Sequence, residues 1–378
     1  MRELNLTRPG QFRWLTRPDP VLLDDEDVIV RPFIVGRCDG DWLVTHSARL
    51  RALRLAQRLR LLDPILYRSF GPTPYIQPCA IGHECVGEVV DVGSAVTTVA
   101  VGDKVVIPFQ VSCGRCEMCR RGLTSLCTTA AADTHDHPRV LSWYGHGPAT
   151  GPYGGMAADL IRVPFGNHMA VPVPAGLDPL RIAAASDNLS DAWRVTVPLL
   201  QDQANARVLV VGGLARAIGL YAAGIAATLG ARVDYLDSRR ERLDIAESLG
   251  ATPIRRSNLI RFPQPKNLYD HVIDASNLPT GIVHAVQSTA PGGTCITPSY
   301  HLALRTGIPL MHMTFNNLDL AIGMNNPGTT LSDVLEWVHA NDFPAEKVTT
   351  AVINWDDAPE NYAQRATKLV MYRPPLHP

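Results

Sequence analysis

The sequence lacks several features that would place it in a specialised class of protein. Its 35 basic and 36 acidic residues nearly cancel, so the formal net charge is only −1. A nucleic-acid-binding surface usually carries a clear basic excess, and this composition argues against one. The chain also shows no collagen-like period, no heptad array and no repeat of about 20–50 residues. Fibrous and solenoid folds are therefore excluded.

Long apolar runs are missing as well. The first residues, 1–6, contain no apolar core of signal-peptide length. The most apolar long segment, 208–229, is interrupted by Arg216 and several glycines. A strand, a turn and a buried helix explain this segment better than a membrane span does. We therefore expect a cytoplasmic protein that has no membrane partner.

The chain does contain enough apolar material for two ordinary domains. It has 378 residues, of which 46% are hydrophobic and 19% are charged. This length exceeds that of one typical domain, and the composition is that of a folded rather than a disordered protein. Two packed cores are the simplest expectation.

Residue patterns change along the chain in a way that predicts an α/β fold. The first third is rich in β-branched runs, such as Asp27–Arg31 and Gly87–Val92. From about Arg207 onward, strand patterns alternate with helical ones, which predicts a parallel, doubly wound sheet. The expected strands are 207–211, 232–237, 271–274 and 294–297, and the expected helices are 218–229 and 240–249. We divide the chain into a β-rich domain at 1–174, a nucleotide-type domain at 175–320, and a tail at 321–378 that returns to the first domain.

Four of the eight cysteines lie within fifteen residues. They are Cys113, Cys116, Cys119 and Cys127. Such spacing lets one tight loop present four thiolates, which suits a tetrahedral zinc ion with no open position, and hence a structural site. An iron–sulfur site and a pair of disulfides are the alternatives. In an intracellular chain a cluster of this kind is more often a metal site.

A second group of residues has the composition of a catalytic zinc site. His83 and Glu84 lie in a glycine-bounded segment, with Cys38 upstream and Asp187 downstream. Together they offer a thiolate, an imidazole and a carboxylate. Three protein ligands that leave a fourth position open are typical of a zinc ion acting as a Lewis acid.

A glycine turn follows the strand predicted at 207–211. Gly212, Gly213 and Gly219 permit a tight strand-to-helix turn and the approach of a pyrophosphate. Gly212 and Gly219 are seven positions apart, which is wider than the outer spacing of G-x-G-x-x-G. Arg216 either contacts phosphate or points to solvent.

Asp237 ends the next predicted strand and strengthens the prediction of a dinucleotide site. A carboxylate at this position can accept both ribose hydroxyls and would repel a 2′-phosphate, so NAD is favoured. The residues that follow, Ser238, Arg239 and Arg240, keep NADP as an alternative.

With these motifs in place, the chain resembles the zinc-dependent medium-chain alcohol dehydrogenases. The segment Gly82-His83-Glu84-x-x-Gly87-x5-Gly93-x2-Val96 fits the zinc signature of that family, and the four-cysteine lobe at 113–127 follows it. The resemblance extends over roughly 27–370. It implies a GroES-like catalytic domain, a Rossmann cofactor domain, two zinc ions per chain, and NAD(P)-linked interconversion of an alcohol and an aldehyde or ketone. A homodimer or homotetramer is also implied.

The resemblance further assigns roles to single residues. Cys38, His83 and Asp187 match the catalytic zinc ligands, Glu84 matches a glutamate near the metal, and Asp41 matches the aspartate that supports the ligand histidine. Many members carry a hydroxyl residue for proton transfer at the position that Gly40 occupies here. The candidates for that role are Asp41, His46, Glu84 and Asp191, the last matching a cofactor-contacting threonine. Cys79 and Cys85 match no ligand and are predicted to be buried thiols.

Cys38 and His83 are 45 positions apart, roughly twice the usual separation in the family. The extra segment includes an amphipathic helix predicted at 47–62, with one apolar and one basic face. The apolar face holds Leu55, Leu59 and Leu62, and the basic face holds Arg51, Arg54 and Arg58. This helix either packs against the protein or an oligomer partner, or forms a lid that narrows the substrate pocket. A helix on a membrane surface is a further alternative.

Two other functions remain open at this point. The missing hydroxyl and the wide glycine spacing are compatible with a non-redox step, such as an elimination or a rearrangement, or with a specialised reduction. A non-catalytic protein that binds dinucleotide is less favoured, because nothing structural requires an open metal site. His135 and His137 suggest either a third metal site or, more simply, a polar loop.

Overall fold

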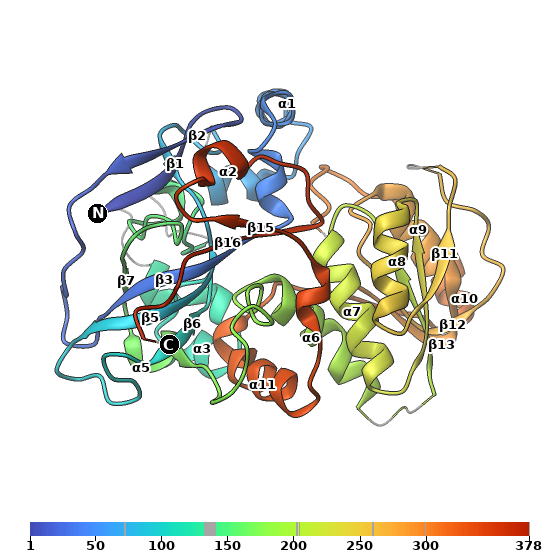
Figure 1. Ribbon diagram of the computed structural model, residues 1–378. Helices are drawn as coiled ribbons and strands as arrows, with labels where there is room; N and C mark the ends of the chain where they lie inside the picture. The colour runs from blue at the N-terminus through green and yellow to red at the C-terminus, as the bar shows by residue number, and fades with distance from the viewer. Residues whose placement is uncertain are drawn as a thin grey trace. The chain divides into compact units, whose positions relative to one another are not determined.

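The computed structural model describes residues 1–71, 73–131, 141–201, 203, 205–258, 261–298 and 300–377, with only the main chain of Trp42. His135 and His137 lie outside the described residues. The chain forms two compact units. The first comprises 1–187, 326–339 and 349–378, and the second comprises 188–325 and 340–348 (Figure 1).

Antiparallel sheets dominate the first unit. A three-stranded sheet has the order β2 (Gln11–Thr16), β1 (Arg2–Arg8), β4 (Cys79–Ala80). A larger sheet has the order β15 (Thr349–Asn354), β16 (Lys368–Tyr372), β3 (Val28–Arg37), β5 (Glu84–Val92), β6 (Lys104–Ile107), β8 (Val171–Pro172), and β7 (Ile161–Val163) also pairs with β3. Nearly every residue of β3 is buried, because this long central strand is covered on both faces. The β-rich character predicted for this part of the chain is confirmed.

Six parallel strands form the sheet of the second unit. Their order is β11 (Thr252–Arg255), β10 (Arg232–Asp237), β9 (Arg207–Val211), β12 (Tyr269–Asp274), β13 (Thr289–Thr297), β14 (Asp319–Ile322). All neighbouring pairs are parallel, so the predicted doubly wound sheet is confirmed. The strand order reverses direction between β9 and β12, and ligands of such sheets bind at the carboxyl ends of the strands beside this point.

Helices precede or connect these strands in the second unit. They are α6 (Asn188–Leu200), α7 (Arg216–Thr228), α8 (Arg240–Ser248), α9 (Pro279–Ser288) and α10 (Leu310–Asn316). Helices α7 and α8 contact each other and lie side by side against the sheet (Figure 1). Strand β13 begins five positions before the predicted 294–297. The sequence did not indicate this earlier start, because the first residues of the strand include Pro291, Gly292 and Gly293 and show no apolar pattern. Outside this unit, helix α11 spans Pro327–Ala340.

The insertion between Cys38 and His83 contains two helices, α1 (Ser47–Arg58) and α2 (Pro64–Phe70). The predicted helix is confirmed from Ser47, but it ends at Arg58, four residues before the predicted end. Its predicted apolar face is wrong, since Leu55 and Leu59 are 57% and 60% exposed. The buried side instead carries Leu50, with Arg54 and Gln57 one and two turns further along. Arg54 donates to the carbonyls of Pro74 and Tyr75, and Gln57 donates to that of Gly71. The main-chain carbonyls of Gly71, Pro74 and Tyr75 therefore determine which face of α1 points inward. The hydrophobicity of the side chains alone does not predict this orientation.

Among the described residues, no helix combines the length and the apolar character needed to cross a membrane.

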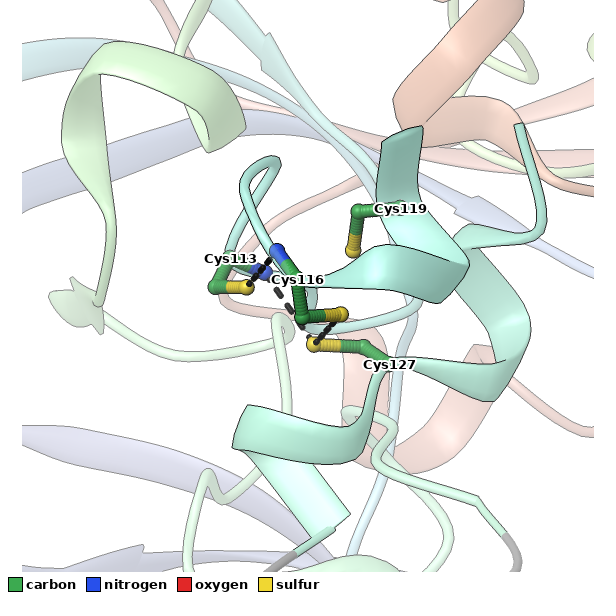
Figure 2. Close-up of side chains that lie close together, drawn as sticks. All are labelled: Cys113, Cys116, Cys119 and Cys127. Carbon is green, nitrogen blue, oxygen red and sulfur yellow. Dashed lines mark hydrogen bonds between the residues drawn. The ribbon is translucent and has the colours of Figure 1, made fainter. Parts of the chain in front are cut away.

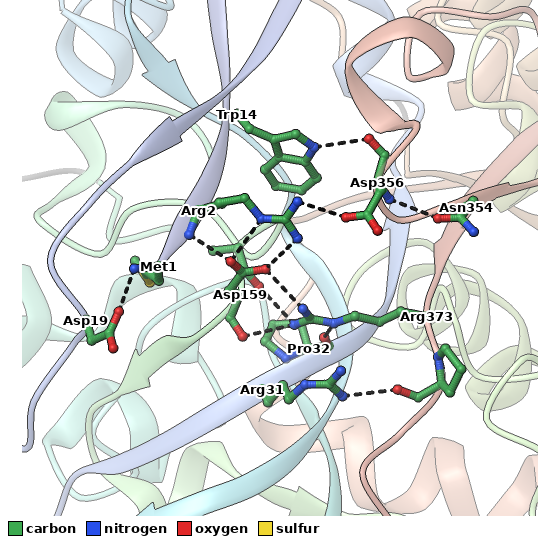
Figure 3. A network of polar contacts seen from close by, with 12 residues as sticks. Met1, Arg2, Trp14, Asp19, Arg31, Pro32, Asp159, Asn354, Asp356 and Arg373 are labelled. Carbon is green, nitrogen blue, oxygen red and sulfur yellow. Dashed lines mark hydrogen bonds and ion pairs between the residues drawn. The ribbon is translucent and has the colours of Figure 1, made fainter.

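A polar network ties the amino-terminal strand of the first unit to its last residues (Figure 3). The Asp159 carboxylate accepts the main-chain N–H of Arg2 at 2.8 Å, the Arg2 side chain at 3.2 and 3.3 Å, and Arg373 Nη1 at 3.0 Å. The Arg373 guanidinium also lies over the Trp355 ring, 4.0 Å from its centroid. One carboxylate therefore holds two guanidinium groups from opposite ends of the chain.

We predict that Asp159→Asn lowers the stability of the first unit at neutral pH by about 1–2 kcal/mol, since a charged acceptor is lost. Burial raises the pKa of Asp159, but the hydrogen bonds from Arg2 outweigh it and hold the pKa below its usual value. The stabilisation is therefore present above the usual carboxyl pKa and is lost as the pH falls below it. Thermal unfolding at pH 7 and at about pH 3, below the usual carboxyl pKa, should show a difference from wild type that shrinks at the lower pH. Asp356→Asn, at a 70% exposed carboxylate, is the control and should change little.

Candidate functional site

Cys38, His83 and Asp187 converge in the first unit. Their ligand atoms all lie within 4.8 Å of one another. The Cys38 thiol donates to Asp187 Oδ2 at 2.9 Å, and His83 Nε2 lies 3.5 Å from the same oxygen. One sulfur, one nitrogen and one oxygen at this separation fit a zinc ion, and three protein ligands leave a position for a substrate oxygen.

Neighbouring strands place the first two of these residues. Strand β3 ends directly before Cys38, and β5 begins directly after His83. The two strands pair antiparallel, with Gly36 opposite Glu84, so both ligand residues emerge at the same end of the sheet. Gly36 has to be a glycine here, because a Cβ at this position would lie 2.4 Å from Glu84 Oε2 and 2.6 Å from the Ala183 carbonyl.

Burial and crowded acidic groups shift the protonation of this cluster. Burial, followed by the negative charge of Asp187, raises the pKa of the Cys38 thiol well above its ordinary value. Burial alone would lower the pKa of His83, but Asp41 and Asp187 raise it to about 9. Burial also acts to raise the pKa of Asp187, yet the contact with His83 leaves it lowered. The cluster therefore attracts positive charge, and a divalent cation would replace the protons on Cys38 and His83.

Two further acidic side chains, Asp41 and Glu84, lie beside this cluster. Asp41 is fully buried, and its Oδ1 lies 3.7 Å from His83 Nδ1. Glu84 is also fully buried and accepts a hydrogen bond from Lys368 Nζ on β16. No sequence motif indicated Lys368, although a lysine that opens an apolar strand, followed by Leu369, Val370 and Met371, is a signal that a buried carboxylate lies nearby.

Aromatic side chains surround His83, and part of this group comes from the insertion. The His146 ring lies 4.6 Å from the His83 ring, centroid to centroid. Its Nδ1 is 2.9 Å from the Tyr144 carbonyl, so Nδ1 donates and carries the proton. Phe70 of helix α2 lies 5.8 Å from the His146 ring, as does Tyr75. The insertion therefore reaches the residues around the ligand histidine. No sequence motif indicated His146.

The four-cysteine lobe forms the second cluster (Figure 2). The sulfurs of Cys113, Cys116, Cys119 and Cys127 lie within 4.8 Å of one another. Main-chain N–H groups already point at them, since Cys116 N donates to Cys113 Sγ and Cys113 N to Cys127 Sγ, each at 3.3 Å. Burial raises the pKa of Cys116, but N–H donors such as that of Cys119 bring it down to about 5. None of the eight cysteines, all of which lie in the described part of the chain, forms a disulfide, and this donor set fits a closed tetrahedral zinc site.

Of the other predicted proton-transfer residues, Asp191 lies in the first turn of α6 in the second unit and pairs with Arg194 at 2.7 Å. His46 Nδ1 lies 3.1 Å from the Thr45 hydroxyl.

The glycine turn lies between β9 and α7, as predicted. A Cβ on Gly213 would lie 2.4 Å from the Ser276 carbonyl, and one on Gly219 would lie 3.0 Å from Ala275 Cβ. Leu214 N donates to Ser276 O at 3.0 Å, so the turn rests directly on the main chain that follows β12. The glycines are therefore explained by close packing of the strand-to-helix turn, which is also what a dinucleotide fold requires at this position. Arg216, the first residue of α7, is buried.

Asp237 ends β10 and is fully buried. Its Oδ1 accepts the main-chain N–H of Ser238 at 2.6 Å and of Arg239 at 2.9 Å, and Arg242 binds both oxygens at 2.6 and 2.9 Å. The Tyr235 hydroxyl completes the set at 3.2 Å. The sequence analysis missed Arg242 and Tyr235, because neither belongs to the glycine motif. A ribose hydroxyl that reaches Asp237 must share it with Arg242.

Comparison with known proteins agrees with this geometry. Residues 24–175 match the alcohol dehydrogenase GroES-like domain, and residues 217–340 match the zinc-binding dehydrogenase domain. A probable zinc-binding alcohol dehydrogenase, Rv1895 of Mycobacterium tuberculosis, is 26% identical, with 96% of this chain and 85% of the relative covered. The medium chain reductase/dehydrogenase ucsI of an Acremonium species is 31% identical over 63% of this chain and 70% of the relative.

A solved structure and a D-xylulose reductase are also similar. The alcohol dehydrogenase TADH from Thermus sp. ATN1 superposes with a TM-score of 0.80 at 26% identity, covering 98% of this chain and 99% of the other. D-xylulose reductase A of Aspergillus oryzae is 26% identical, covering 92% of this chain and 88% of the relative.

The chain therefore belongs to the zinc-dependent medium-chain alcohol dehydrogenase family. It is an oxidoreductase with a GroES-like domain and a Rossmann domain, and it uses zinc and NAD(P) to interconvert an alcohol and an aldehyde or ketone. The predicted family, fold class and reaction class are confirmed.

We predict that Gly213→Ala disrupts the glycine turn. The added methyl group would overlap the Ser276 main chain, forcing the turn away from β12 and lowering stability by about 1–3 kcal/mol. We expect NADH affinity to fall at least about tenfold, since the helix start that faces the pyrophosphate moves. Fluorescence titration with NADH and thermal unfolding measure the two effects. Gly307→Ala is the matched control, because a Cβ there meets nothing within 4 Å. An unchanged NADH affinity in Gly213→Ala would contradict the prediction.

Proposed function

We propose that each chain holds two zinc ions, a catalytic one on Cys38, His83 and Asp187 and a structural one on the four-cysteine lobe. The convergence of a thiolate, an imidazole and a carboxylate within 4.8 Å carries the proposal for the catalytic ion. When bound, zinc polarises the oxygen of an alcohol or carbonyl substrate, and the nicotinamide accepts or donates the hydride. The substrate is a small molecule, since neither the charge nor the fold suggests a macromolecular one.

The other residues of the cluster hold these ligands in place. Asp41 faces the Nδ1 side of His83 and leaves Nε2 for the metal. Glu84 is held by Lys368, so its carboxylate is less free to move toward a substrate proton and acts mainly through its charge. Because Gly40 has no hydroxyl, the substrate proton must leave by another path. Of the predicted groups, Asp191 remains a proposed proton-transfer or cofactor-contacting residue, with Arg194 as its partner.

For the cofactor we propose NAD rather than NADP. Asp237 places a buried carboxylate at the carboxyl end of β10, where a dinucleotide fold binds the adenosine ribose. Gly212, Gly213 and Gly219 shape the turn before α7, and Arg216 and Arg239 lie at the starts of α7 and α8 as candidate phosphate contacts. Similar folds use both cofactors. One from Sinorhizobium meliloti at 22% identity is bound to NADP, and one from Escherichia coli at 20% identity is complexed with NADH.

We also propose a cytoplasmic homodimer or homotetramer that binds neither membrane nor nucleic acid. Strand β14 is the last strand of its sheet, and edge strands favour pairing with another chain. Exposed apolar side chains occur on β14 and on the preceding helix α10. They are Ile322, Leu310, Met311 and Phe315, at 69%, 68%, 68% and 79% exposure.

The zinc proposal predicts the metal content of two variants. Wild-type protein should contain close to two zinc ions per chain, and Cys38→Ala close to one, with NADH binding retained in both. Cys116→Ser should instead lose the other ion and unfold at lower temperature, because a structural zinc contributes folding energy. Metal analysis by mass spectrometry, together with NADH titration on the same samples, measures this. A wild type with one zinc that Cys38→Ala keeps would refute the catalytic site.

The cofactor proposal predicts a charge-dependent preference. Wild type should bind NADH at least about tenfold more tightly than NADPH, because the Asp237 carboxylate repels a 2′-phosphate. In Asp237→Asn the ratio should fall toward one, since the charge is removed while the size is kept. Asp244→Asn, which removes an exposed charge that pairs with Arg240, is the control and should keep the wild-type ratio. Tighter binding of NADPH by wild type would overturn the choice of NAD.

A further inference from the structure

Tyr362 is a buried residue that no motif of the sequence indicated. It follows the short helix α12 (Ala358–Asn361) near the carboxyl end of the chain and is fully buried in the first unit. Its ring lies 5.0 Å from that of Phe12, centroid to centroid. Its hydroxyl donates a hydrogen bond of 3.0 Å to Asp41 Oδ2, across 321 positions of sequence. The hydroxyl therefore has one specific acceptor.

The two oxygens of Asp41 have different surroundings. Oδ2 accepts from Tyr362, whereas Oδ1 is buried 3.7 Å from His83 Nδ1. Within the described part of the chain, neither Asp41 Oδ1 nor His83 Nδ1 has a hydrogen-bond partner. This buried acceptor and this buried ring nitrogen face each other without other partners, and a small movement would bring them within hydrogen-bond distance.

The other nitrogen of His83 determines what this pair can do. His83 Nε2 faces Asp187, on the side of the proposed metal ligands. A neutral imidazole that binds a metal through Nε2 must carry its proton on Nδ1, and the acceptor of that proton fixes the tautomer and the ring orientation. Asp41 Oδ1 is the acceptor in position. The orientation of Asp41 therefore determines the tautomer and the ring orientation of His83.

Arg37 anchors Tyr362 to the same strand that leads to Cys38. The Arg37 guanidinium donates to the carbonyls of Tyr362 and Gln364, the latter at 2.9 Å, and lies 5.9 Å from the centroid of the Tyr362 ring. On the other side of Cys38, Asp41 N donates to the Cys38 carbonyl at 3.2 Å. The main chain that carries Tyr362 is thus fixed relative to both Cys38 and Asp41.

We propose that Tyr362 is a positioning residue for the metal site. Its hydroxyl holds Asp41 Oδ2, which aims Oδ1 at the Nδ1 proton of His83 and keeps Nε2 available to the metal. This inference rests on the proposed catalytic zinc site. Removing the hydroxyl takes the hydrogen-bond donor away from Asp41 Oδ2 and lets the Asp41 side chain rotate more freely. His83 is then held less well as a metal ligand.

The test is Tyr362→Phe, which removes only the hydroxyl and keeps the packing against Phe12. We expect zinc to leave the Cys38 site about 10-fold faster, the lower end of the loss in metal affinity found when such a supporting contact is removed. Zinc loss is followed with a chromophoric chelator, and the visible absorption of the cobalt(II)-substituted protein should shift as the ligand geometry changes. The zinc of the four-cysteine lobe serves as an internal reference and should leave at the wild-type rate.

Two controls separate positioning from a general loss of structure. Tyr269→Phe removes a hydroxyl that also donates to a carboxylate, Asp234 at 2.7 Å, in the second unit, and it should leave both zinc rates unchanged. In an Asp41→Asn background, Tyr362→Phe should add less than about twofold, because the tyrosine acts through Asp41. The inference is overturned if Tyr362→Phe keeps the wild-type zinc rate and cobalt spectrum, or if its effect is undiminished in Asp41→Asn. A wild type without the second zinc would instead refute the proposed metal site itself.

Discussion

Compensation of buried negative charge is the constraint on which the metal site depends. Asp41, Glu84 and Asp187 are all buried beside the Cys38 thiol. Isolated buried carboxylates are costly, so each needs a cation or a hydrogen-bond donor. Lys368 supplies one to Glu84, Tyr362 supplies one to Asp41, and His83 faces Asp187. In the proposed site, a divalent cation bound by Cys38, His83 and Asp187 would meet the remaining deficit.

This compensation explains why the first unit draws on both ends of the chain. The ligands Cys38 and His83 come from the paired strands β3 and β5, but the groups that neutralise their neighbours come from the last residues, since β16 brings Lys368 beside β3. A chain that ended before β16 would keep the ligand cysteine and histidine and leave Glu84 buried without its cation. The carboxyl-terminal segment therefore belongs to the proposed metal site, because it supplies Lys368 to Glu84 and Tyr362 to Asp41.

Features whose geometry depends on the spacing of neighbouring residues could be predicted from the sequence. The short intervals within the four-cysteine lobe and the strand–glycine–helix pattern near Gly212 each encode their geometry over a few residues, and the structure contains both. The partners Lys368 and Tyr362 lie 284 and 321 positions from the residues they hold, so only tertiary pairing reveals them. Helix α1 shows the same limit, because main-chain carbonyls of a later loop, and not its leucine pattern, decide that Arg54 faces inward.

Asp41, beside the proposed metal site, and Asp237, beside the glycine turn, differ in how many hydrogen-bond donors they receive. Asp237 receives donors from Arg242, Tyr235 and two main-chain N–H groups, which leaves its carboxylate fixed before any cofactor binds. Asp41 receives one donor and leaves Oδ1 opposite His83 at a distance that is not yet a hydrogen bond. Asp237 therefore holds its loop in place whether or not a cofactor is bound. Asp41 Oδ1, in contrast, would gain a partner only when His83 becomes a metal ligand. At the proposed metal site, metal binding would therefore bring Asp41 Oδ1 and His83 Nδ1 into hydrogen-bond distance, and this new contact would contribute to the free energy of binding.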